Sequence, residues 1–447
     1  MGKPTGFMDY DRIETPAYDP AARVGSFDWF LEEIPSSKRT QQAGRCMDCG
    51  VPFCQAGLQL NRQLIGCPLH NLIPEWNDQL WHENLPMALE RLLCTNCFPE
   101  FTGYVCPAPC EKACATGRVS SAVTIHDNER HIIETAFSSG LMTPHAPVQR
   151  SGLTVAVVGS GPAGLTVAQL LNQRGHQVCV YERHLTPGGL LVYGIPSMKL
   201  PKSVVARRIQ LMRDEGVEFL CGVNVGKDVS VAQLCEQYDA VVLCQGAQKP
   251  RTVAFEGQAS GVCFALDYLG AQAAAQLDEA PLVDTFNAQG KTVAVVGAGD
   301  SANDCIATAL RQGAADVVQL IRRPAADYAP MTDYAHAEAD TVLDHDIRRF
   351  QTTVSAITAD ASGALCSIEL QTPEGAQTIP AELLVIASGF SGPEEYVTAG
   401  LDTAQYPPLF EAGDAATGAS LVVQAMAHAR QIAAQVDTYL VGYTNIK

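Results

Sequence analysis

The sequence predicts an α/β protein with two strand–glycine–helix units behind a mainly α-helical, cysteine-rich segment. Residues 154–164 read as a buried β-branched strand, a tight glycine turn and the start of a helix. Residues 291–302 repeat that stretch closely, which makes it the clearest internal duplication in the chain. Nine of the 16 cysteines fall between Cys46 and Cys114, in a proline-bearing region without this pattern.

The first glycine turn has the spacing G-x-G-x-x-G. Its first glycine makes the turn, the second lets a pyrophosphate approach the backbone, and the third allows the helix to pack against the strand. Such a turn also occurs in α/β proteins that bind no nucleotide. Here the next apolar run ends in Glu182, where an acid would bond to a ribose hydroxyl. The residues expected to bind a dinucleotide are Gly159, Gly161, Pro162, Ala163, Gly164 and Glu182.

The second unit differs from the first at the end of its second strand. The apolar run 316–321 ends in Arg322 and Arg323, with no acid. Two guanidiniums there would bind a 2′-phosphate and leave a plain ribose diol without its acceptor, so we predict NADPH rather than NADH. The alternative is that both arginines only cover a solvated strand end. The loop residues expected to contribute are Gly297, Gly299, Asp300 and Ser301.

The first unit is then left with FAD, and the C-terminal region favours this assignment. Gly413 and Asp414 follow an apolar run and would place a carboxylate on flavin hydroxyls. A helix predicted from Ser420 and Leu421 onwards would aim its positive end at the flavin pyrimidine and stabilise negative charge on the reduced ring. Hydride transfer from nicotinamide to flavin needs no general acid or base, so no catalytic residue is singled out.

These observations predict that one Rossmann-like domain is inserted into the other. Residues 1–150 form the helical domain, and residues 151–255 form the first part of the FAD domain. Residues 256–385 form the NADPH domain. Residues 386–447 return to complete the FAD domain.

Composition and charge exclude several other classes of protein. The net charge of −18 argues against nucleic acid and acidic membrane surfaces as partners. No apolar run has transmembrane length and the first 20 residues lack a signal pattern, so we expect a cytoplasmic protein. Cysteines in such a chain are not expected to form disulfides.

The cysteine cluster is explained by metal ligation. Structural zinc would accept four such ligands, but thiolates beside a flavin favour iron–sulfur clusters, which carry single electrons. Seven ligands leave two four-ligand clusters one short. Either a thiol of Cys94-x-x-Cys97 or the carboxylate of Glu129 would complete the set, and the sequence leaves both open. The seven predicted thiolates are Cys46, Cys49, Cys54, Cys67, Cys106, Cys110 and Cys114.

The chain resembles, nearly end to end, the small (β) subunit of NADPH-dependent bacterial glutamate synthase. Two departures stand out: Cys94 and Cys97 replace other residues of the family pattern, and segment 324–346 does not match it. The resemblance rests on the segments 1–7, 45–50, 71–77, 98–103, 105–111, 188–196 and 420–423.

The resemblance implies a function and its cofactors. In this family FAD accepts hydride from NADPH, and two [4Fe–4S] clusters pass electrons to the FMN of a large (α) subunit, which makes L-glutamate from L-glutamine and 2-oxoglutarate. A hetero-oligomer is therefore expected. By the same resemblance, one cluster would use Cys46, Cys49, Cys54 and Cys114, and the other Cys67, Cys106, Cys110 and Glu129. Residues implied near the flavin are Gly189, Leu190 and Lys199.

Three rival functions fit parts of the pattern. A related electron-transfer subunit would share these cofactors but serve a ferredoxin, a sulfide reaction or a pyrimidine-reducing partner. A flavin disulfide reductase would use Cys94 and Cys97, although this pair lies among the cluster ligands. A non-enzymatic NADPH or iron sensor would keep both cofactor motifs without turnover.

Overall fold

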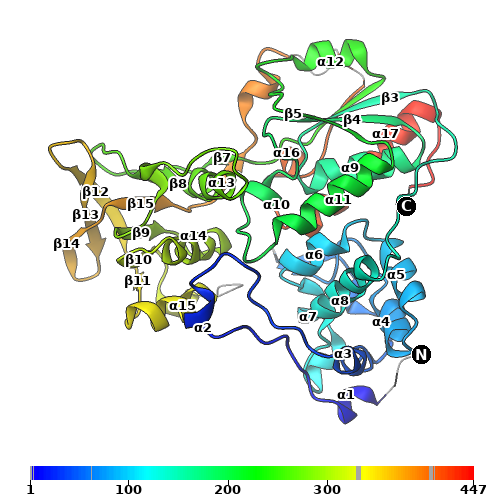
Figure 1. Ribbon diagram of the computed structural model, residues 1–447, viewed down its shortest axis with the longest axis horizontal. Helices are drawn as coiled ribbons and strands as arrows, with labels where there is room; N and C mark the ends of the chain where they lie inside the picture. The colour runs from blue at the N-terminus through cyan, green and yellow to red at the C-terminus, as the bar shows by residue number, and fades with distance from the viewer. Residues whose placement is uncertain are drawn as a thin grey trace.

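The computed structural model describes residue 3 and residues 5–61, 63–328, 334–401, 406 and 408–446. Part of segment 1–7 and residues 329–333 of segment 324–346 therefore lie outside the described residues. The molecule has a helical part and two α/β parts, which lie side by side (Figure 1). None of the described helices combines the length and the apolar character that crossing a bilayer requires.

The helical part holds the cysteine-bearing loops. Several of its helices have proline in the first turn, where the missing N–H of proline would be unpaired in any case. The elements are α1 (Gly6–Asp9), α2 (Pro20–Arg23), α3 (Ser36–Ala43), η1 (Phe53–Gln55), β1 (Leu58–Leu60), β2 (Gln63–Ile65), α4 (Ile73–Trp81), α5 (Leu85–Leu93), α6 (Pro99–Val105), α7 (Pro109–Lys112), η2 (Ala115–Arg118) and α8 (Ile125–Ser138).

The first α/β part is a parallel sheet of order β17-β6-β3-β4-β5. Strand β17, at one edge of this sheet, comes from the C-terminal region, so the chain returns to complete the sheet as predicted. The strands are β3 (Thr154–Val158), β4 (Gln177–Glu182), β5 (Glu218–Cys221), β6 (Ala240–Leu243) and β17 (Leu409–Glu411). The helices are α9 (Pro162–Gln173), α10 (Leu190–Tyr193), α11 (Lys202–Asp214), α12 (Val231–Gln237), α16 (Asp414–Thr417) and α17 (Val422–Val441).

The second α/β part is a parallel sheet of order β11-β10-β9-β15-β8, with a three-stranded antiparallel sheet beside it that the sequence did not predict. A short pair, β7 (Lys249–Pro250) with β16 (Phe390–Gly392), joins the two parts. The main strands are β8 (Val262–Phe264), β9 (Thr292–Val296), β10 (Asp316–Ile321), β11 (Arg348–Phe350) and β15 (Leu383–Ile386). The antiparallel strands are β12 (Thr353–Ala359), β13 (Leu365–Thr372) and β14 (Gly375–Pro380), and the helical elements are α13 (Ala265–Gln276), η3 (Asp284–Phe286), α14 (Asp300–Arg311), η4 (Ala325–Asp327) and α15 (Tyr334–Leu343). The short helix η5 (Glu395–Thr398) follows β16 and packs against the first α/β part through Val397.

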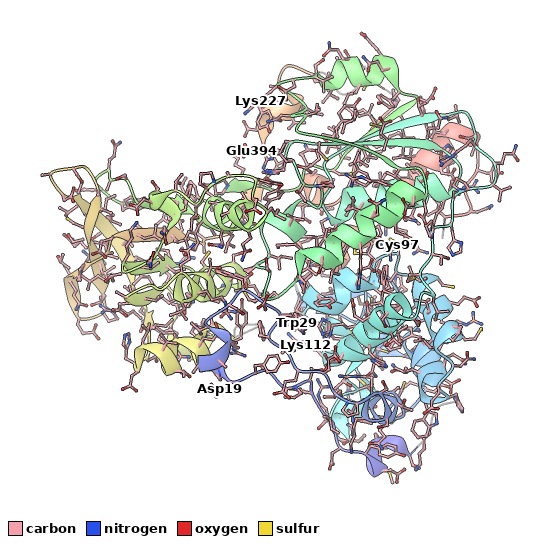
Figure 2. The ribbon with its side chains drawn as sticks, in the orientation of Figure 1. Asp19, Trp29, Cys97, Lys112, Lys227 and Glu394 are labelled. Carbon is pink, nitrogen blue, oxygen red and sulfur yellow. The ribbon has the colours of Figure 1, made fainter. Side chains whose placement is uncertain are left out.

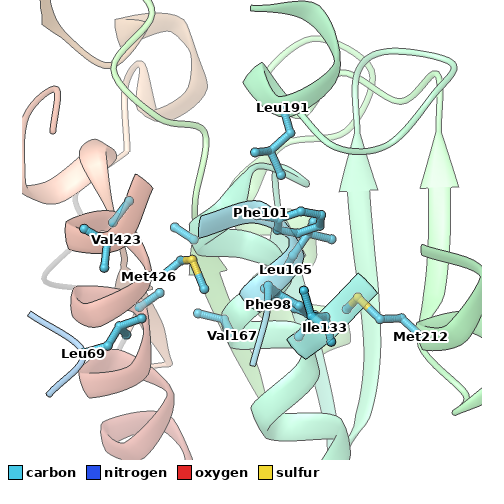
Figure 3. Close-up of a cluster of buried hydrophobic side chains, with 14 of the residues drawn as sticks. Leu69, Phe98, Phe101, Ile133, Leu165, Val167, Leu191, Met212, Val423 and Met426 are labelled. Carbon is cyan, nitrogen blue, oxygen red and sulfur yellow. The ribbon is translucent and has the colours of Figure 1, made fainter. Parts of the chain in front are cut away.

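One continuous hydrophobic core joins the helical part to the first α/β part (Figure 3). Phe98 and Phe101 of α6 and Ile133 of α8 belong to the same cluster as Leu165 of α9 and Met426 of α17. All five side chains are fully buried. Burial of a large apolar side chain stabilises the packed state by about 1.5–3 kcal/mol, so this contact fixes the helical part in place.

Residues 15–32, which we name the N-terminal strap, reach from the helical part to the second α/β part (Figures 1 and 2). Trp29 packs edge-on against Tyr104 of α6, with ring centroids 4.7 Å apart. The next residue, Phe30, stacks on Tyr334 of α15 at 5.1 Å. Two neighbouring aromatic residues of the strap therefore pack against two different parts of the molecule.

A buried ion-pair network secures the same strap. Arg23 of α2 lies 2.7 Å from the carboxylate of Glu338 in α15, and Arg311 of α14 lies 2.6 Å from it. Glu338 and Arg311 are fully buried, and Arg23 nearly so. Removing one member of such a network leaves buried charge without its partner, which is strongly destabilising.

The predicted fold class is confirmed. The two Rossmann-like units are present, the second is inserted into the first, and the cysteine-rich region is mainly helical. The predicted C-terminal helix begins at Val422, two residues after Ser420.

Candidate functional site

The three glycines of the first turn have different surroundings. Gly159 has a φ of +101°, which favours glycine. A Cβ added at Gly164 would lie 1.9 Å from the carbonyl oxygen of Gly159, so α9 can approach β3 only without a side chain there. A Cβ added at Gly161 would meet no atom within 4 Å. The space beside Gly161 is therefore open at the N-terminus of α9, where Pro162 and Ala163 begin the helix.

Glu182 lies at the end of β4 and holds the same loop. Its carboxylate accepts hydrogen bonds from the backbone N–H of Ser160 at 3.1 Å and from the Ser160 hydroxyl at 2.5 Å. The Ser160 Oγ in turn accepts the N–H of Gly188 at 2.8 Å. Sequence reasoning did not single out Ser160. Its position between the first two glycines of the turn is the signal that could have identified it.

Two more segments converge on the start of α9. A Cβ at Gly189 would lie 2.8 Å from Cα of Gly161, so the turn that precedes Leu190 and α10 backs directly onto the glycine loop. A Cβ at Gly413 would lie 2.4 Å from Cβ of Ala163. Three predicted segments, 159–164, 182–190 and 413–414, therefore meet at this point.

Asp414 follows Gly413 and faces the start of α17. Its carboxylate accepts hydrogen bonds from the backbone N–H and the hydroxyl of Ser420. Burial raises the pKa of Asp414 above its ordinary value, while the Ser420 hydrogen bonds lower it. Leu421 is the residue that precedes the first turn of α17. The contact holds the N-terminus of a 20-residue helix beside the glycine loop.

The second glycine turn repeats this geometry. Gly297 has a φ of +150°, and a Cβ at Gly299 would meet no atom within 4 Å. Asp300 and Ser301 form the first turn of α14. Both turns therefore leave room beside their second glycine, which is the fit that a bound pyrophosphate requires.

Arg322 and Arg323 directly follow β10, and both are exposed. Within the described part of the chain, neither guanidinium makes an ion pair or a side-chain hydrogen bond. Both are therefore available to an external anion.

Lys199 lies between the two α/β parts. Its Nζ donates to Asp304 of α14 at 2.9 Å, and the hydroxyl of Tyr334 donates to the same carboxylate at 2.7 Å. Burial raises the pKa of Asp304, and the Lys199 ammonium opposes that rise. Sequence reasoning placed Lys199 near the flavin but did not find Asp304, which is more than a hundred residues away in the chain.

The predicted cluster ligands lie around two separate cavities. Ile73 lines both cavities, and Val423, in the first turn of α17, lines the second. The first cavity is lined by Cys46, Cys49, Cys54 and Cys114. The second is lined by Cys67, Cys106, Cys110 and Glu129.

Burial favours the protonated form of these groups when no metal is bound. It raises the pKa of the Cys46 thiol to about 12 and that of Cys67 to about 11, and raises the pKa of Cys110 well above its usual value. Burial also raises the pKa of Glu129 to about 7, while hydrogen bonds from Thr102 and Asn96 lower it. Metal binding at either cavity must therefore release protons.

The spread of the thiols distinguishes a cluster from a single ion. Within the described ranges, no three His, Cys, Asp or Glu side chains are close enough to hold one metal ion. Zinc needs its ligands to converge at about 2.0–2.3 Å. An iron–sulfur cluster lies between its thiolates and holds them further apart, so the donors present fit a cluster better than a zinc ion.

Cys94 and Cys97 lie elsewhere. Neither lines either cluster cavity. Cys97, which Figure 2 labels, packs against Thr166 of α9. Burial raises the pKa of the Cys97 thiol to about 11, whereas a reactive thiol has a lowered pKa. All 16 cysteines are free thiols.

Comparison with protein families defines the class of protein. Residues 153–429 match the family described as pyridine nucleotide-disulphide oxidoreductase. Residues 23–141 match the family described as dihydropyrimidine dehydrogenase domain II, 4Fe-4S cluster. The chain is thus a pyridine nucleotide oxidoreductase with an N-terminal iron–sulfur domain.

Curated relatives make the assignment more specific. The chain is 42% identical to the glutamate synthase [NADPH] small chain of Bacillus subtilis, over 99% of both chains. It is 40% identical to that of Mycobacterium tuberculosis, over 99% of this chain and 97% of the relative. The chain belongs to the family of glutamate synthase small chains, and the resemblance inferred from its motifs is confirmed.

Two further comparisons concern a longer relative of this chain and a solved structure of low sequence identity. The chain is 39% identical to the glutamate synthase [NADH] of Schizosaccharomyces pombe, over 99% of this chain but only 23% of that protein. Among solved structures, Mycobacterium tuberculosis FprA in complex with NADPH aligns with a TM-score of 0.51 and 20% identity, over 65% of this chain and 85% of FprA. At that identity the likeness shows the fold alone.

Proposed function

We propose that this chain is the NADPH-oxidising electron-input subunit of a glutamate synthase. Electrons would pass from NADPH to FAD, then through two [4Fe–4S] clusters, and on to the FMN of a large subunit that makes L-glutamate from L-glutamine and 2-oxoglutarate. Family membership supports this class of activity. The arrangement of the two cavities carries the proposal further.

The order of the carriers follows from two shared side chains. Val423, near the expected flavin end of α17, lines the cavity of Cys67, Cys106 and Cys110. Ile73 lines that cavity and also the one that holds the Cys46 thiol. The first helical turn of α17 therefore adjoins the second cavity, and the two cavities have Ile73 in common. This supports a serial path from the flavin through the second cavity to the first.

The cofactor residues are proposed on the same geometry. The FAD residues are Gly159, Gly161, Pro162, Ala163, Gly164, Glu182, Gly189, Leu190, Lys199, Gly413, Asp414, Ser420 and Leu421. The NADPH residues are Gly297, Gly299, Asp300, Ser301, Arg322 and Arg323. The cluster ligands are the four thiols of the first cavity, and the three thiols of the second cavity with Glu129 as the eighth ligand.

In this proposal, the residues of this chain position the cofactors. Bound flavin supplies the chemistry, since it accepts a hydride and releases electrons singly. The N-terminus of α17 would favour negative charge on the reduced ring. Asp414 and Ser420 hold that helix start in place. The proposed division is 1–150, 151–255, 256–385 and 386–447, with the cluster domain first and the NADPH domain third.

A large subunit is the proposed partner. In the Schizosaccharomyces pombe relative, the matching region is 23% of one longer polypeptide, so there the corresponding region is covalently part of the enzyme. In this chain, Val51 and Phe53 lie in the loop between Cys49 and Cys54 and are 73% and 51% exposed. Exposed apolar side chains around the last carrier support docking of that subunit there. A cytoplasmic location is proposed because cluster thiols need reducing conditions.

The test uses protein purified anaerobically. It should contain about one FAD and about eight iron atoms per chain, by the ligand count. With NADPH it should reduce an artificial acceptor but make no glutamate until the large subunit is added. Zinc without iron would contradict the electron path. Full acceptor reduction but no coupling to any large subunit would instead favour the related ferredoxin, sulfide or pyrimidine-type subunits.

A further inference from the structure

Arg45, the residue directly before the predicted ligand Cys46, is a buried cation beside the first cluster cavity. Its side chain belongs to a residue that is only 1% exposed. The guanidinium donates hydrogen bonds to the carbonyl oxygens of Tyr10 and Ser121. Val123, two residues after Ser121, lines the cavity, and so does Cys46. Both ends of the Arg45 side chain are therefore attached to segments that form the wall of that cavity.

The positive charge of Arg45 is not balanced by an ion pair. Within the described residues, no carboxylate lies at ion-pair distance from Arg45, and its Nε donates to no acceptor. Two other arginines of the helical part are paired, Arg12 with Glu111 at 2.7 Å and Arg39 with Asp127 at 3.4 Å. Because a guanidinium stays protonated in proteins, Arg45 holds its charge in the interior with only backbone carbonyls around it.

The neighbouring groups place this charge within electrostatic reach of the cluster ligands. Burial lowers the pKa of the Arg45 guanidinium and the charge of Arg12 lowers it further, whereas Asp11 and the ligand Cys114 raise it. Asp11 is exposed, and so is Asp48 in the loop between the first two ligands. Water and salt screen exposed charges far more than buried ones. The Arg45 charge therefore acts on the cavity with less screening than these two carboxylates.

A buried cation at this position would favour the reduced form of a cluster. Reduction adds one electron, and so one negative charge, and a fixed positive charge stabilises it most where the dielectric constant is low. The potentials of iron–sulfur clusters depend on the charges around them. We propose that Arg45 raises the reduction potential of the cluster in the first cavity, so that this cluster accepts the electron that NADPH delivers through the flavin and the second cavity. This inference rests on the proposed function, because it requires a cluster there.

The test is a redox titration of the anaerobically purified protein with its cofactors, followed by electron paramagnetic resonance. Arg45→Gln should lower the equilibrium constant for one-electron reduction of one cluster by at least about tenfold, or about 59 mV. The other cluster should keep its potential. Arg45→Lys, which retains the charge but not the forked hydrogen bonds, should stay within about threefold of the wild type. Equal lowering in both variants, or no lowering in Arg45→Gln, would overturn the proposal.

The matched control is Arg118→Gln, the same substitution at an exposed arginine of η2, two residues after the cavity-lining Thr116. Solvent screens this charge, so the equilibrium constant should change by less than about threefold. A change as large as that in Arg45→Gln would mean that burial of the charge is not what matters.

A second variant covers the case in which Arg45→Gln does not fold or load iron. Ser121 is exposed and its carbonyl oxygen already accepts from Arg45, so the carboxylate of Ser121→Asp would pair with the guanidinium and offset its charge. The potential of one cluster should then fall relative to Ser121→Asn, which adds no charge. Equal potentials in these two variants would overturn the proposal. A wild-type protein without iron would instead contradict the proposed function itself.

Discussion

At the scale of single residues, Arg322 and Arg323 carry the choice of nucleotide. Both guanidiniums are exposed and unpaired within the described chain, so a 2′-phosphate would meet them without breaking another contact. Hydrogen bonds to charged groups are worth about 1.5–3 kcal/mol each. Two such contacts contribute about 3 kcal/mol or more together, so we expect replacement of both by alanine to weaken NADPH binding by about 100-fold or more and NADH binding by about 3-fold or less.

Equilibrium titration of the reduced nucleotides measures this difference. Arg213→Ala, on α11 of the other α/β part, is the matched control and should change neither affinity. Equal weakening of NADPH and NADH would mean that the arginines serve only the strand end.

Glu129 is the residue proposed as the eighth ligand of the iron–sulfur clusters. It lies with three thiols, whereas Cys94 and Cys97 do not. Glu129→Ala should lower the iron content from about eight atoms toward about four per chain, because one cluster loses its fourth ligand. Cys97→Ser should leave the content unchanged, measured by iron analysis with electron paramagnetic resonance of the reduced protein. The reverse pattern would assign the eighth ligand to the Cys94–Cys97 pair.

The raised thiol pKa values predict how pH affects the metal-free protein. The folded thiols of Cys46 and Cys67 have pKa values of about 12 and about 11, above the unfolded value of about 8.5. Above pH 8.5 the unfolded chain loses these protons while the folded chain keeps them, so folded-state stability falls as pH rises. Apoprotein should therefore lose thermal stability between pH 8.5 and about 11, and iron-loaded protein should lose less. Thermal melts of both forms across that range measure the effect.

At the scale of elements, Gly161 and Gly164 of the first turn have different roles. Gly161 leaves room for the cofactor, and Gly164 allows α9 to pack closely on β3. Gly161→Ala adds a methyl group into open space, so the chain should fold normally but bind FAD poorly because the methyl group occupies the pyrophosphate position. Gly164→Ala forces that group to within 1.9 Å of a backbone oxygen, so α9 must move away from β3 and stability should fall. Thermal melts together with flavin content of the two variants test this contrast. Similar loss of stability in both would contradict it.

The elements that the sequence predicted are those whose structure is determined by residues close together in the chain. The run 154–158 is β-branched except at Ala156, and a glycine with positive φ follows it, so β3 and its turn could be predicted without any knowledge of the rest of the chain. The contact of Lys199 with Asp304 could not, because it joins a loop of one domain to a helix of another. The antiparallel strands β12 to β14 were also missed. Their alternating burial gives a weaker signal than a continuous apolar run.

At the scale of the whole molecule, the N-terminal strap holds the helical part and the second α/β part together. Phe30 is 9% exposed on α15, and Tyr18 in the same strap is 50% exposed. Phe30→Ala should lower the free energy of unfolding by about 3 kcal/mol and speed proteolytic cleavage within residues 15–32. Tyr18→Ala should change neither quantity by much. Chemical denaturation and limited trypsin digestion of the two variants provide the comparison.

The grouping of the cluster ligands around two cavities is also a property of the whole molecule. The sequence supplied the thiols but not their grouping, which came only from the family resemblance, because spacing along a chain does not fix which loops meet in space. Cys114 joins Cys46, although Cys106 and Cys110 are much closer to it in sequence. The strap was likewise beyond sequence reasoning, because each of its contacts joins residues far apart in the chain.

The strap also sets an order of events during synthesis. Arg23 donates to the carbonyl oxygen of Tyr334, which is 311 residues later in the chain. A ribosome that adds about 5–20 residues per second needs roughly 15–60 s to cover that distance. Throughout that interval Phe30 lacks the ring of Tyr334 on which it stacks, so the strap reaches its final place only after residues far later in the chain have been made.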